Sequence, residues 1–314
     1  HGSECFGYDD DLSTDHDFEP GFCIWIDKET EKEIGFKLFR AYNSLPKEYK
    51  GYKMKDESLF GSKTKGVHTI DEFYGFYIGK MPTTNEEWLR IPDFYLAEAT
   101  NGEVFFDGQG KFTNIRNTLK NDRPEDVRYK KLASSIFYMA QYGQYNYKRC
   151  LEHNEKVAAA TCLSEFATNA AKVVYLLNKK YAPYYKWLFK GMKELKTLGY
   201  IYDSIEKLLE DPYNTNKENP ELIDSICIEV EKELRKQNLS DRTEVYLEGY
   251  AYCINNKIKD NNLRPFLILG EVEKSLNNKT INGLGKMQGG NFTLNFLTEE
   301  ISCYAQDFEI TTYD

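Results

Sequence analysis

Two aspartates one residue apart are the first residues of this sequence that could do chemistry. Asp15 and Asp17 stand in "TDHDF", and on a strand their side chains would point to the same face. Carboxylates held that close repel each other unless a positive charge lies between them, and a divalent cation binds oxygen ligands well. Gly2-Ser3 precedes them in a predicted turn, whose N–H groups and hydroxyl suit a phosphate. The spacing therefore indicates a site for metal and phosphate.

An acidic surface turn is the competing interpretation of the same stretch. The run "DDDLSTDHD" is rich in aspartate, and such runs are usually solvated. Without Gly2-Ser3 and the downstream sequence, we would favour the surface turn. With them, we favour the catalytic interpretation.

The composition narrows the class of protein. The chain has 314 residues, of which 41% are hydrophobic and 15% aromatic, so it can bury a core and is not globally disordered. A net charge of -9 argues against a nucleic-acid partner that needs broad phosphate neutralisation. We expect no membrane span, because no run of 18 apolar residues occurs, and no secretion signal. Seven scattered cysteines indicate reduced thiols in a cytoplasm, without a disulfide frame or a zinc site.

The first part of the chain, residues 1–127, mixes strand and helix patterns. We predict a helix over 28–43, capped by Asp27, with a core-facing stripe of Ile34, Phe36, Leu38, Phe39 and Tyr42. The stretch "GVHTIDEFYGFYIG" predicts a strand-like start and a short helix capped by Asp71. The stretch "LAEATNGEVFFDGQGKFTNIR" predicts a hairpin, because Gly-containing turns interrupt β-rich residues. The charged "NDRPEDVRYKK" predicts a domain boundary.

Residues 128–270 show apolar residues at helical spacing. The clearest cases are "YKKLASSIFYMAQYGQYNYKRCLEH", "VAAATCLSEFATNAAKVVYLLNKKY", "YYKWLFKGMKELKTLG" and "LIDSICIEVEKELRKQ". Residues 271–314 are first polar and Gly-rich and then weakly strand-like, and we assign them no role. The predicted fold class is therefore α+β: a mixed-sheet domain, a helical bundle and a C-terminal extension.

The stretch "GSECFGYDDDLSTDHDF" resembles the signature of the polymerase-β-like nucleotidyltransferases. The matching positions are Gly2, Ser3, Gly7, Thr14, Asp15 and Asp17. Further along, "GQYNYKR", "VVYLLNKKYAPYYKW" and "NGEVFFDGQGKFTNIR" resemble a bacterial branch of that superfamily that is a domain of unknown function. Antibiotic nucleotidyltransferases of the same superfamily also pair such a domain with a helical one. The resemblance covers roughly residues 1–270.

The resemblance implies transfer of a nucleoside monophosphate from an NTP, expected to be ATP, to a hydroxyl of a small molecule or a protein. Two Mg²⁺ ions can stabilise the attacking and leaving oxygens of such an in-line displacement, and carboxylates suit Mg²⁺. Asp15 and Asp17 would be the shared ligands, and Gly2 and Ser3 would hold the triphosphate. The site would lie between the two domains, and a homo-oligomer is left open.

Family members carry a third carboxylate, for which Asp71 is our candidate. A role as helix cap is equally compatible with its position. Glu98, Glu103 and Asp107 are rivals, and Asp107 also fits a structural role in the "DGQG" turn. His68 is expected to be structural.

The helical part supplies weaker candidates. Lys186 in "PYYKWL" is proposed to contact the triphosphate, and snorkelling to solvent is an equal alternative. Tyr145 and Arg149 are four residues apart on one predicted helix, so they share a face; a solvated face is slightly favoured over a cleft lining. Glu165 is a general-base candidate on the strength of its place in an apolar helix.

One departure from the family pattern concerns the start of its fold. Family members place a helix and a strand before the Gly-Ser turn, whereas here only His1 precedes Gly2. We expect these elements to be missing, replaced by the C-terminal extension or supplied by another chain. Two other functions stay open: a catalytically silent nucleotide sensor, and a toxin–antitoxin type interaction module.

Overall fold

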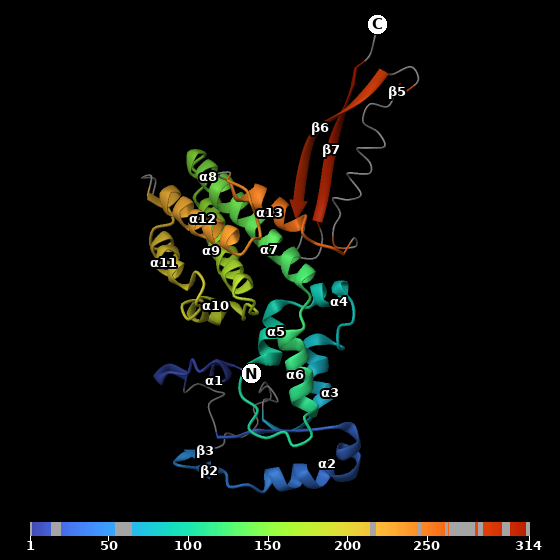
Figure 1. Cartoon of the computed structure of the whole chain (residues 1–314). Helices are drawn as coiled ribbons and strands as arrows, with labels where there is room; N and C mark the ends of the chain where they lie inside the picture. The colour runs from blue at the N-terminus through green and yellow to red at the C-terminus, as the bar shows by residue number, and fades with distance from the viewer. Residues whose placement is uncertain are drawn as a thin grey trace. The chain divides into compact units, whose positions relative to one another are not determined.

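The computed structural model describes most of the chain. It covers residues 2–13, 20–53, 65–213, 218–243, 246–260 and 263, and the backbone of three C-terminal strands. The chain divides into two compact units (Figure 1). The first unit comprises His1–Pro82 and Ile91–Arg123, and the helical unit comprises Thr83–Arg90 and Pro124–Asp314. Small sheets accompany many helices, in keeping with an α+β class. The division into separate domains stays a prediction.

The first unit contains two short sheets and several helices. Strand β1 (Cys23–Ile26) pairs in parallel with β4 (Gly66–Thr69), and Trp25 lies opposite His68. Strands β2 (Glu48–Tyr49) and β3 (Tyr52–Lys53) form an antiparallel pair. The helices are α1 (Ser3–Phe6), α2 (Lys28–Asn43), α3 (Ile70–Ile78), α5 (Asp93–Thr100) and α6 (Lys111–Asn121), with a 3₁₀ turn at Asp11–Ser13.

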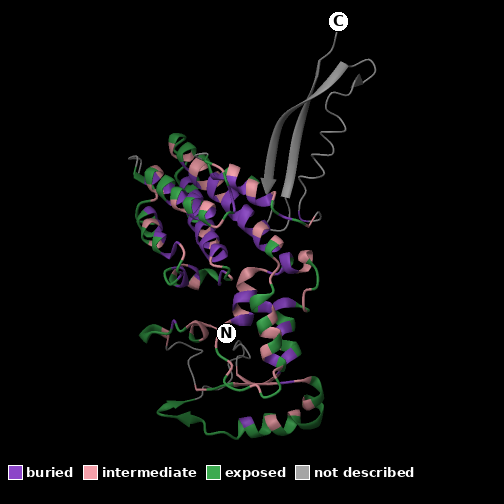
Figure 2. Ribbon diagram, in the orientation of Figure 1, coloured by how far each residue is buried: buried purple, intermediate pink, exposed green. Residues whose placement is uncertain are grey.

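Helix α2 confirms the predicted cap and corrects the predicted stripe. It begins after Asp27, whose Oδ1 accepts a hydrogen bond from the Thr30 amide at 2.7 Å. Tyr42 is its one buried residue. Phe36 is 73% exposed and Phe39 is 53% exposed, so the stripe does not face a core in the described structure. Figure 2 shows α2 as largely exposed. The apolar spacing produced the helix, but no described element covers that face.

Helix α3 is capped by Thr69, and the prediction that Asp71 caps it was wrong. The Thr69 hydroxyl accepts from the Glu72 amide at 3.1 Å, and the Glu72 carboxylate accepts from the Thr69 amide at 3.3 Å. This reciprocal capping box satisfies two amides that the first turn leaves open. Asp71 lies inside the first turn of α3, where a negative side chain interacts favourably with the positive end of the helix dipole.

The hairpin predicted for "LAEATNGEVFFDGQGKFTNIR" was also wrong, since helices α5 and α6 occupy its two ends. The turn residues were identified correctly, but they end one helix and begin the next. Gly102 follows α5 with φ +67°, and Gly110 precedes α6 with φ +71°. Phe105 and Phe106, which resembled strand residues, are about 90% exposed between the helices.

An aromatic cluster forms the centre of the first unit. The Trp25 ring lies 4.5 Å from Phe73 and 5.3 Å from Phe112, between ring centroids. The Tyr74 hydroxyl donates to the Phe112 carbonyl at 3.2 Å, which ties α3 to α6. The His68 ring lies 5.3 Å from the Trp25 ring, between centroids, and its Nε2 lies 2.9 Å from the Lys65 carbonyl oxygen. His68 therefore has the structural contacts that we expected.

The helical unit confirms the four helical stretches predicted for residues 128–270. Its elements are α4 (Asn85–Arg90), α7 (Glu125–Met139), a π-helix η2 (Ala140–Tyr147), α8 (Lys148–Glu152), α9 (Lys156–Leu177), α10 (Tyr185–Met192), a 3₁₀ turn η3 (Gly199–Ile201), α11 (Tyr202–Glu210), α12 (Glu218–Lys236) and α13 (Leu247–Asn255). Figure 2 shows α7 and α9 buried along most of their lengths. Phe166, Leu163 and Met139 are fully buried there.

Helix α13 runs antiparallel to α7. The Leu247 amide at its start donates to the Gln144 side chain at 2.9 Å. The Asp260 amide beyond its end donates to Asp126 at 2.8 Å, near the start of α7. These two contacts fix the direction of α13 along α7.

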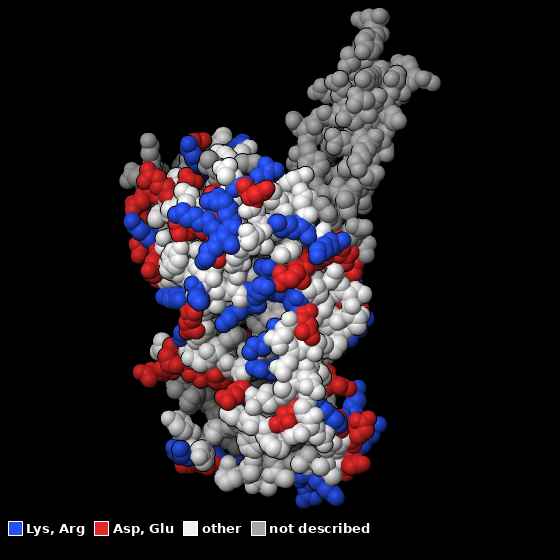
Figure 3. Space-filling view, in the orientation of Figure 1, with Lys and Arg blue, Asp and Glu red and all other residues white. Residues whose placement is uncertain are grey.

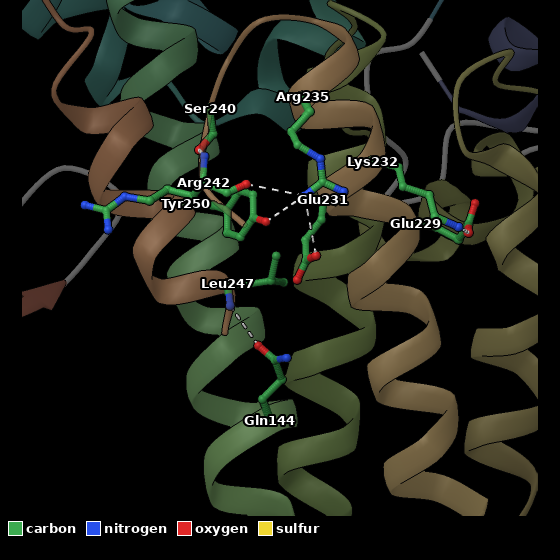
Figure 4. A network of polar contacts seen from close by, with 9 residues as sticks. All are labelled: Gln144, Glu229, Glu231, Lys232, Arg235, Ser240, Arg242, Leu247 and Tyr250. Atoms are coloured by element: carbon green, nitrogen blue, oxygen red, sulfur yellow. Dashed lines mark hydrogen bonds and ion pairs between the residues drawn. The ribbon is translucent and has the colours of Figure 1, made fainter. Parts of the chain in front are cut away.

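A polar network joins α12 to α13 (Figure 4). Arg235 donates to the Tyr250 hydroxyl at 2.8 Å and lies 3.9 Å from the Glu231 carboxylate. Tyr250 is fully buried and Glu231 is nearly so. Burial raises the pKa of Glu231, and the Arg235 charge opposes that shift. The network supplies partners for polar groups that would be costly to bury alone.

The C-terminal extension contains a three-stranded antiparallel sheet. Its strands are β5 (Thr280–Ile281), β6 (Gly285–Phe296) and β7 (Ser302–Thr311), in the order β5-β6-β7. Strand β7 confirms the strand-like pattern predicted near the C-terminus, whereas β5 and β6 lie in the stretch described as polar and Gly-rich.

Candidate functional site

The Gly2-Ser3 turn begins the short helix α1. Gly2 has φ +115° and ψ −172°, a conformation that is open essentially to glycine alone. The Ser3 carbonyl accepts from the Tyr8 amide at 3.0 Å, and Gly7 ends the helix in the left-handed conformation. Helix α1 contains no fully buried residue; Ser3, Cys5 and Phe6 are half-buried, and the Phe6 ring stacks on that of Tyr8.

Asp15 and Asp17 lie outside the described residues, as do Thr14 and His16. The acidic run that precedes them is partly explained by local structure. Asp10 accepts from the Leu12 amide at 3.0 Å and from the Ser13 hydroxyl at 3.1 Å. Asp10 thus organises its own turn, and the metal-binding assignment of Asp15 and Asp17 stays a prediction.

Glu98 is a carboxylate from a distant segment that contacts Gly2 of the Gly2-Ser3 turn. Burial raises its pKa, while hydrogen bonds from the Asn101 side chain and from the Gly2 backbone lower it. The Asn101 Nδ2 lies 3.4 Å from Glu98 Oε2. A half-buried carboxyl group beside the predicted phosphate turn makes Glu98 a stronger rival of Asp71 than its sequence position indicated.

Asp71 has a different neighbour. Its Oδ2 lies 2.8 Å from the Lys28 Nζ at the start of α2, and both side chains are about 60% exposed. The hydrogen bond from Lys28 to Asp71 raises the pKa of the lysine. In the described part of the chain, no hydrogen bond or ion pair joins Asp71 to Gly2 or Ser3. The third-ligand role of Asp71 stays a prediction.

The other two acidic rivals differ from Glu98. Asp107 accepts from the Thr113 amide at 2.8 Å, and its own carbonyl accepts from the Gly110 amide at 3.2 Å. It therefore closes the turn before α6, the structural role weighed for it. Glu103 is exposed in the segment between α5 and α6.

Tyr145 and Arg149 are brought together, as their spacing predicted. The Arg149 guanidinium donates to the Tyr145 hydroxyl and lies 4.9 Å from the centre of its ring. Tyr145 belongs to the π-helix η2, and such segments are frequent at functional sites. Gly143 lets this segment lie close to α9, because a Cβ there would lie 2.3 Å from a Phe166 ring carbon.

Glu165 and Lys186 are exposed on α9 and α10. The Glu165 charge contributes, after burial, to the raised pKa of Tyr142, so these two side chains are neighbours. Among the described residues, no hydrogen bond or ion pair joins Glu165 or Lys186 to the Tyr145–Arg149 pair. Figure 3 shows Lys and Arg side chains gathered on the face of the helical unit turned to the viewer.

Sequence reasoning missed two contributors to the candidate site. The Gly102 amide donates to the Cys5 carbonyl at 3.0 Å, and Arg116 Nη2 donates to the Gly102 carbonyl at 2.6 Å. The Asn-Gly pair at this position was a visible turn signal, but we assigned it to a hairpin. Nothing in the local sequence marks Arg116.

The described residues do not by themselves form a magnesium site. Within the described ranges, no group of three or more His, Cys, Asp or Glu side chains is arranged to hold a metal ion. Glu98 has suitable donor chemistry for Mg²⁺. The remaining predicted ligands are Asp15 and Asp17, beyond those ranges, and Asp71, which pairs with Lys28.

Comparison with known proteins gives two findings. Residues 88–188, about a third of the chain, match a domain of unknown function (DUF4037). A nucleotidyltransferase-like protein from Exiguobacterium sibiricum, known from its crystal structure, is similar at 13% identity and a TM-score of 0.34. That match covers 81% of this chain and 80% of the other. No curated protein matches the chain. No described helix is both long and apolar enough to cross a membrane.

Proposed function

We propose that this chain is a nucleotidyltransferase that moves a nucleoside monophosphate from an NTP to a hydroxyl group. The observation that carries the proposal is the Gly2-Ser3 turn, where a glycine-only conformation precedes a serine and a short helix. In the family that the chain resembles, such a turn precedes a Ser/Thr-Asp-x-Asp sequence, and here Thr14, Asp15 and Asp17 follow the turn in the chain. ATP is the first donor to test, and the acceptor is a small molecule or a protein side chain.

The proposal gives each residue a defined task. Ser3 and the amides beside it bind the triphosphate, and Asp15 and Asp17 hold Mg²⁺, with Asp71 or Glu98 as a third carboxylate. When bound, Mg²⁺ would neutralise negative charge on the phosphate oxygens. Lys186, Tyr145 and Arg149 are assigned to the nucleotide, and Glu165 is assigned to the proton of the acceptor hydroxyl.

The direct test measures pyrophosphate release from each of the four NTPs with Mg²⁺ and a panel of hydroxyl acceptors. Asp15→Asn and Asp17→Asn should reduce release to background, because an amide is a poorer ligand for a hard cation than a carboxylate. Asp9→Asn is the matched control, since Asp9 is an exposed aspartate of the same acidic run. Its release should equal that of the unmodified chain.

A measurement of nucleotide binding distinguishes a transferase from a catalytically silent sensor. Calorimetry with Mg-ATP that shows binding without turnover on any acceptor would favour the silent sensor. Full pyrophosphate release by Asp15→Asn would show that the ligand assignment is wrong. A chain that neither binds nor turns over any NTP would overturn the proposed function.

A further inference from the structure

We infer that Arg116 and Gly102 are positioning residues that hold the Gly2-Ser3 turn in place. The inference rests on the proposed function for its catalytic meaning, and on the contacts of the first unit for its structural part. The turn depends on such contacts because α1 is four residues long and buries none of them. A helix this short has little stability of its own.

The first link is a backbone hydrogen bond from Gly102 to α1. The Gly102 amide donates to the Cys5 carbonyl at 3.0 Å. Gly102 has φ +67°, and a Cβ at this position would lie 3.3 Å from the Cys5 Sγ. Both the conformation and the close approach favour glycine.

The second link is Arg116, which fixes the segment that carries Gly102. Its Nη2 donates to the Gly102 carbonyl at 2.6 Å and to the Asn101 carbonyl at 3.3 Å. Arg116 belongs to α6, so it joins that helix to the turn after α5. Hydrogen bonds from a charged donor are stronger than those between neutral groups.

The third link reaches the other side of Ser3. The Gly2 backbone hydrogen-bonds to Glu98, and Asn101 donates to the same carboxylate at 3.4 Å. Ser3 is therefore flanked by two anchored positions, at Gly2 and at Cys5. The Cys5 anchor, Gly102, lies in the turn that Arg116 holds, and the Gly2 anchor, Glu98 of α5, is joined to that turn through Asn101. Losing the guanidinium should therefore loosen the serine from both sides.

Hydrogen exchange tests the structural part without any assay of activity. Arg116→Ala should speed exchange of the Tyr8 and Gly102 amides by roughly tenfold, the effect expected from losing a charged hydrogen bond. Arg123→Ala is the matched control, because Arg123 is an arginine of the same unit whose side chain is 6% exposed and pairs with Asp93. The control should leave exchange at Tyr8 unchanged. Unchanged exchange in Arg116→Ala would overturn the inference.

Kinetics test the catalytic part. Arg116→Ala should raise KM for the nucleotide more than it lowers kcat, because the turn is assigned to triphosphate binding. Arg116→Lys should recover part of the loss, since it keeps the charge but not the forked donor. Gly102→Ala serves if Arg116→Ala does not fold, because it strains the same turn and leaves the guanidinium in place; it should also raise KM.

The two hypotheses fail in different ways. Faster exchange in Arg116→Ala together with no transferase activity in the unmodified chain would keep the structural link and reject the proposed function. Activity in the unmodified chain with identical KM in all three variants would keep the function and reject the positioning role.

Discussion

The helical unit and the first unit show how differently one kind of sequence pattern can be used. Helix α9 and helix α2 both carry apolar residues at helical spacing. In α9 those residues are buried, including Leu163 and Phe166, whereas in α2 Tyr42 alone is buried. The difference lies in the number of packing partners, because α9 lies among η2, α7, α8, α10 and α11. Periodicity predicts a helix, but its neighbours decide what the helix buries.

The largest expected effect is the loss of stability when a buried ring of α9 is truncated, compared with an exposed ring of α2. Phe166→Ala should destabilise the chain by about 3–5 kcal/mol, because it removes a fully buried ring and leaves a cavity. Phe36→Ala in α2 should change stability by at most about 0.5 kcal/mol, because that ring is 73% exposed. Chemical denaturation followed by circular dichroism measures both. Equal losses would mean that α2 is packed as tightly as α9.

A buried lysine makes the helical unit sensitive to pH. Lys130 in α7 is 2% exposed, and burial lowers its pKa from 10.5 to about 8. Between those values the unfolded chain binds more protons than the folded one, so the free energy of unfolding rises with pH. A shift of this size lowers the free energy of unfolding by about 3 kcal/mol when Lys130 is protonated in the folded chain, and this cost is fully present below pH 8.

Lys130→Met should remove that cost. We expect the variant to be more stable than the unmodified chain by up to about 3 kcal/mol at pH 7, and this advantage should shrink between pH 8 and 10.5. Lys186→Met, at an exposed position, is the control and should show no such pH dependence. Parallel stability curves for Lys130→Met and the unmodified chain would contradict the prediction.

The same glycine substitution should have opposite signs in the two units. Gly143→Ala should destabilise by about 1–3 kcal/mol, because its Cβ would lie 2.3 Å from Phe166 and 3.1 Å from Ile223. Gly75→Ala in α3 meets nothing within 4 Å and should stabilise by about 0.5–1 kcal/mol. Thermal unfolding of the two variants gives the comparison. A destabilised Gly75→Ala would show that α3 is more crowded than described.

The smallest expected effect distinguishes two neighbours at the start of α3. Thr69→Ala should cost about 1 kcal/mol, because it removes the hydroxyl that caps the helix. Asp71→Asn should cost a few tenths of a kcal/mol, because its pair with Lys28 is exposed. Urea unfolding resolves these values. The reverse order would restore Asp71 as the residue that stabilises the helix start.

Local patterns were sufficient for most of the helices. The bounds of α2 and the cap at Asp27 followed from the sequence, as did the four predicted helical stretches of the second unit, whereas α4, α11 and α13 were not predicted. The stretch between α5 and α6 was misassigned because its glycines and aromatic residues fit a hairpin as well as two helix ends. Helix and strand propensities differ little over such short segments, so the packing of α5 and α6 in the first unit decided the outcome.

The candidate site could be predicted only where its residues are close in sequence. Gly2 and Ser3 were proposed from a local pattern and their role stays a prediction, whereas the contact between Tyr145 and Arg149 followed from a four-residue spacing. Glu98 contacts Gly2, and Arg116 contacts Gly102, through the meeting of distant segments, which a single sequence does not encode visibly. The assignment of Asp15 and Asp17 stays a prediction.

The burial of Lys130 also offers a way to measure how often the helical unit opens. Amine-acylating reagents will modify the exposed lysines, such as Lys186. In the folded state these reagents cannot reach Lys130, because its side chain is 2% exposed. Acylation of Lys130 then requires the helices around α7 to part, so its rate reports how often they do so. Peptide mapping after timed labelling would thus measure the opening of this unit at the Lys130 Nζ, without any change to the sequence.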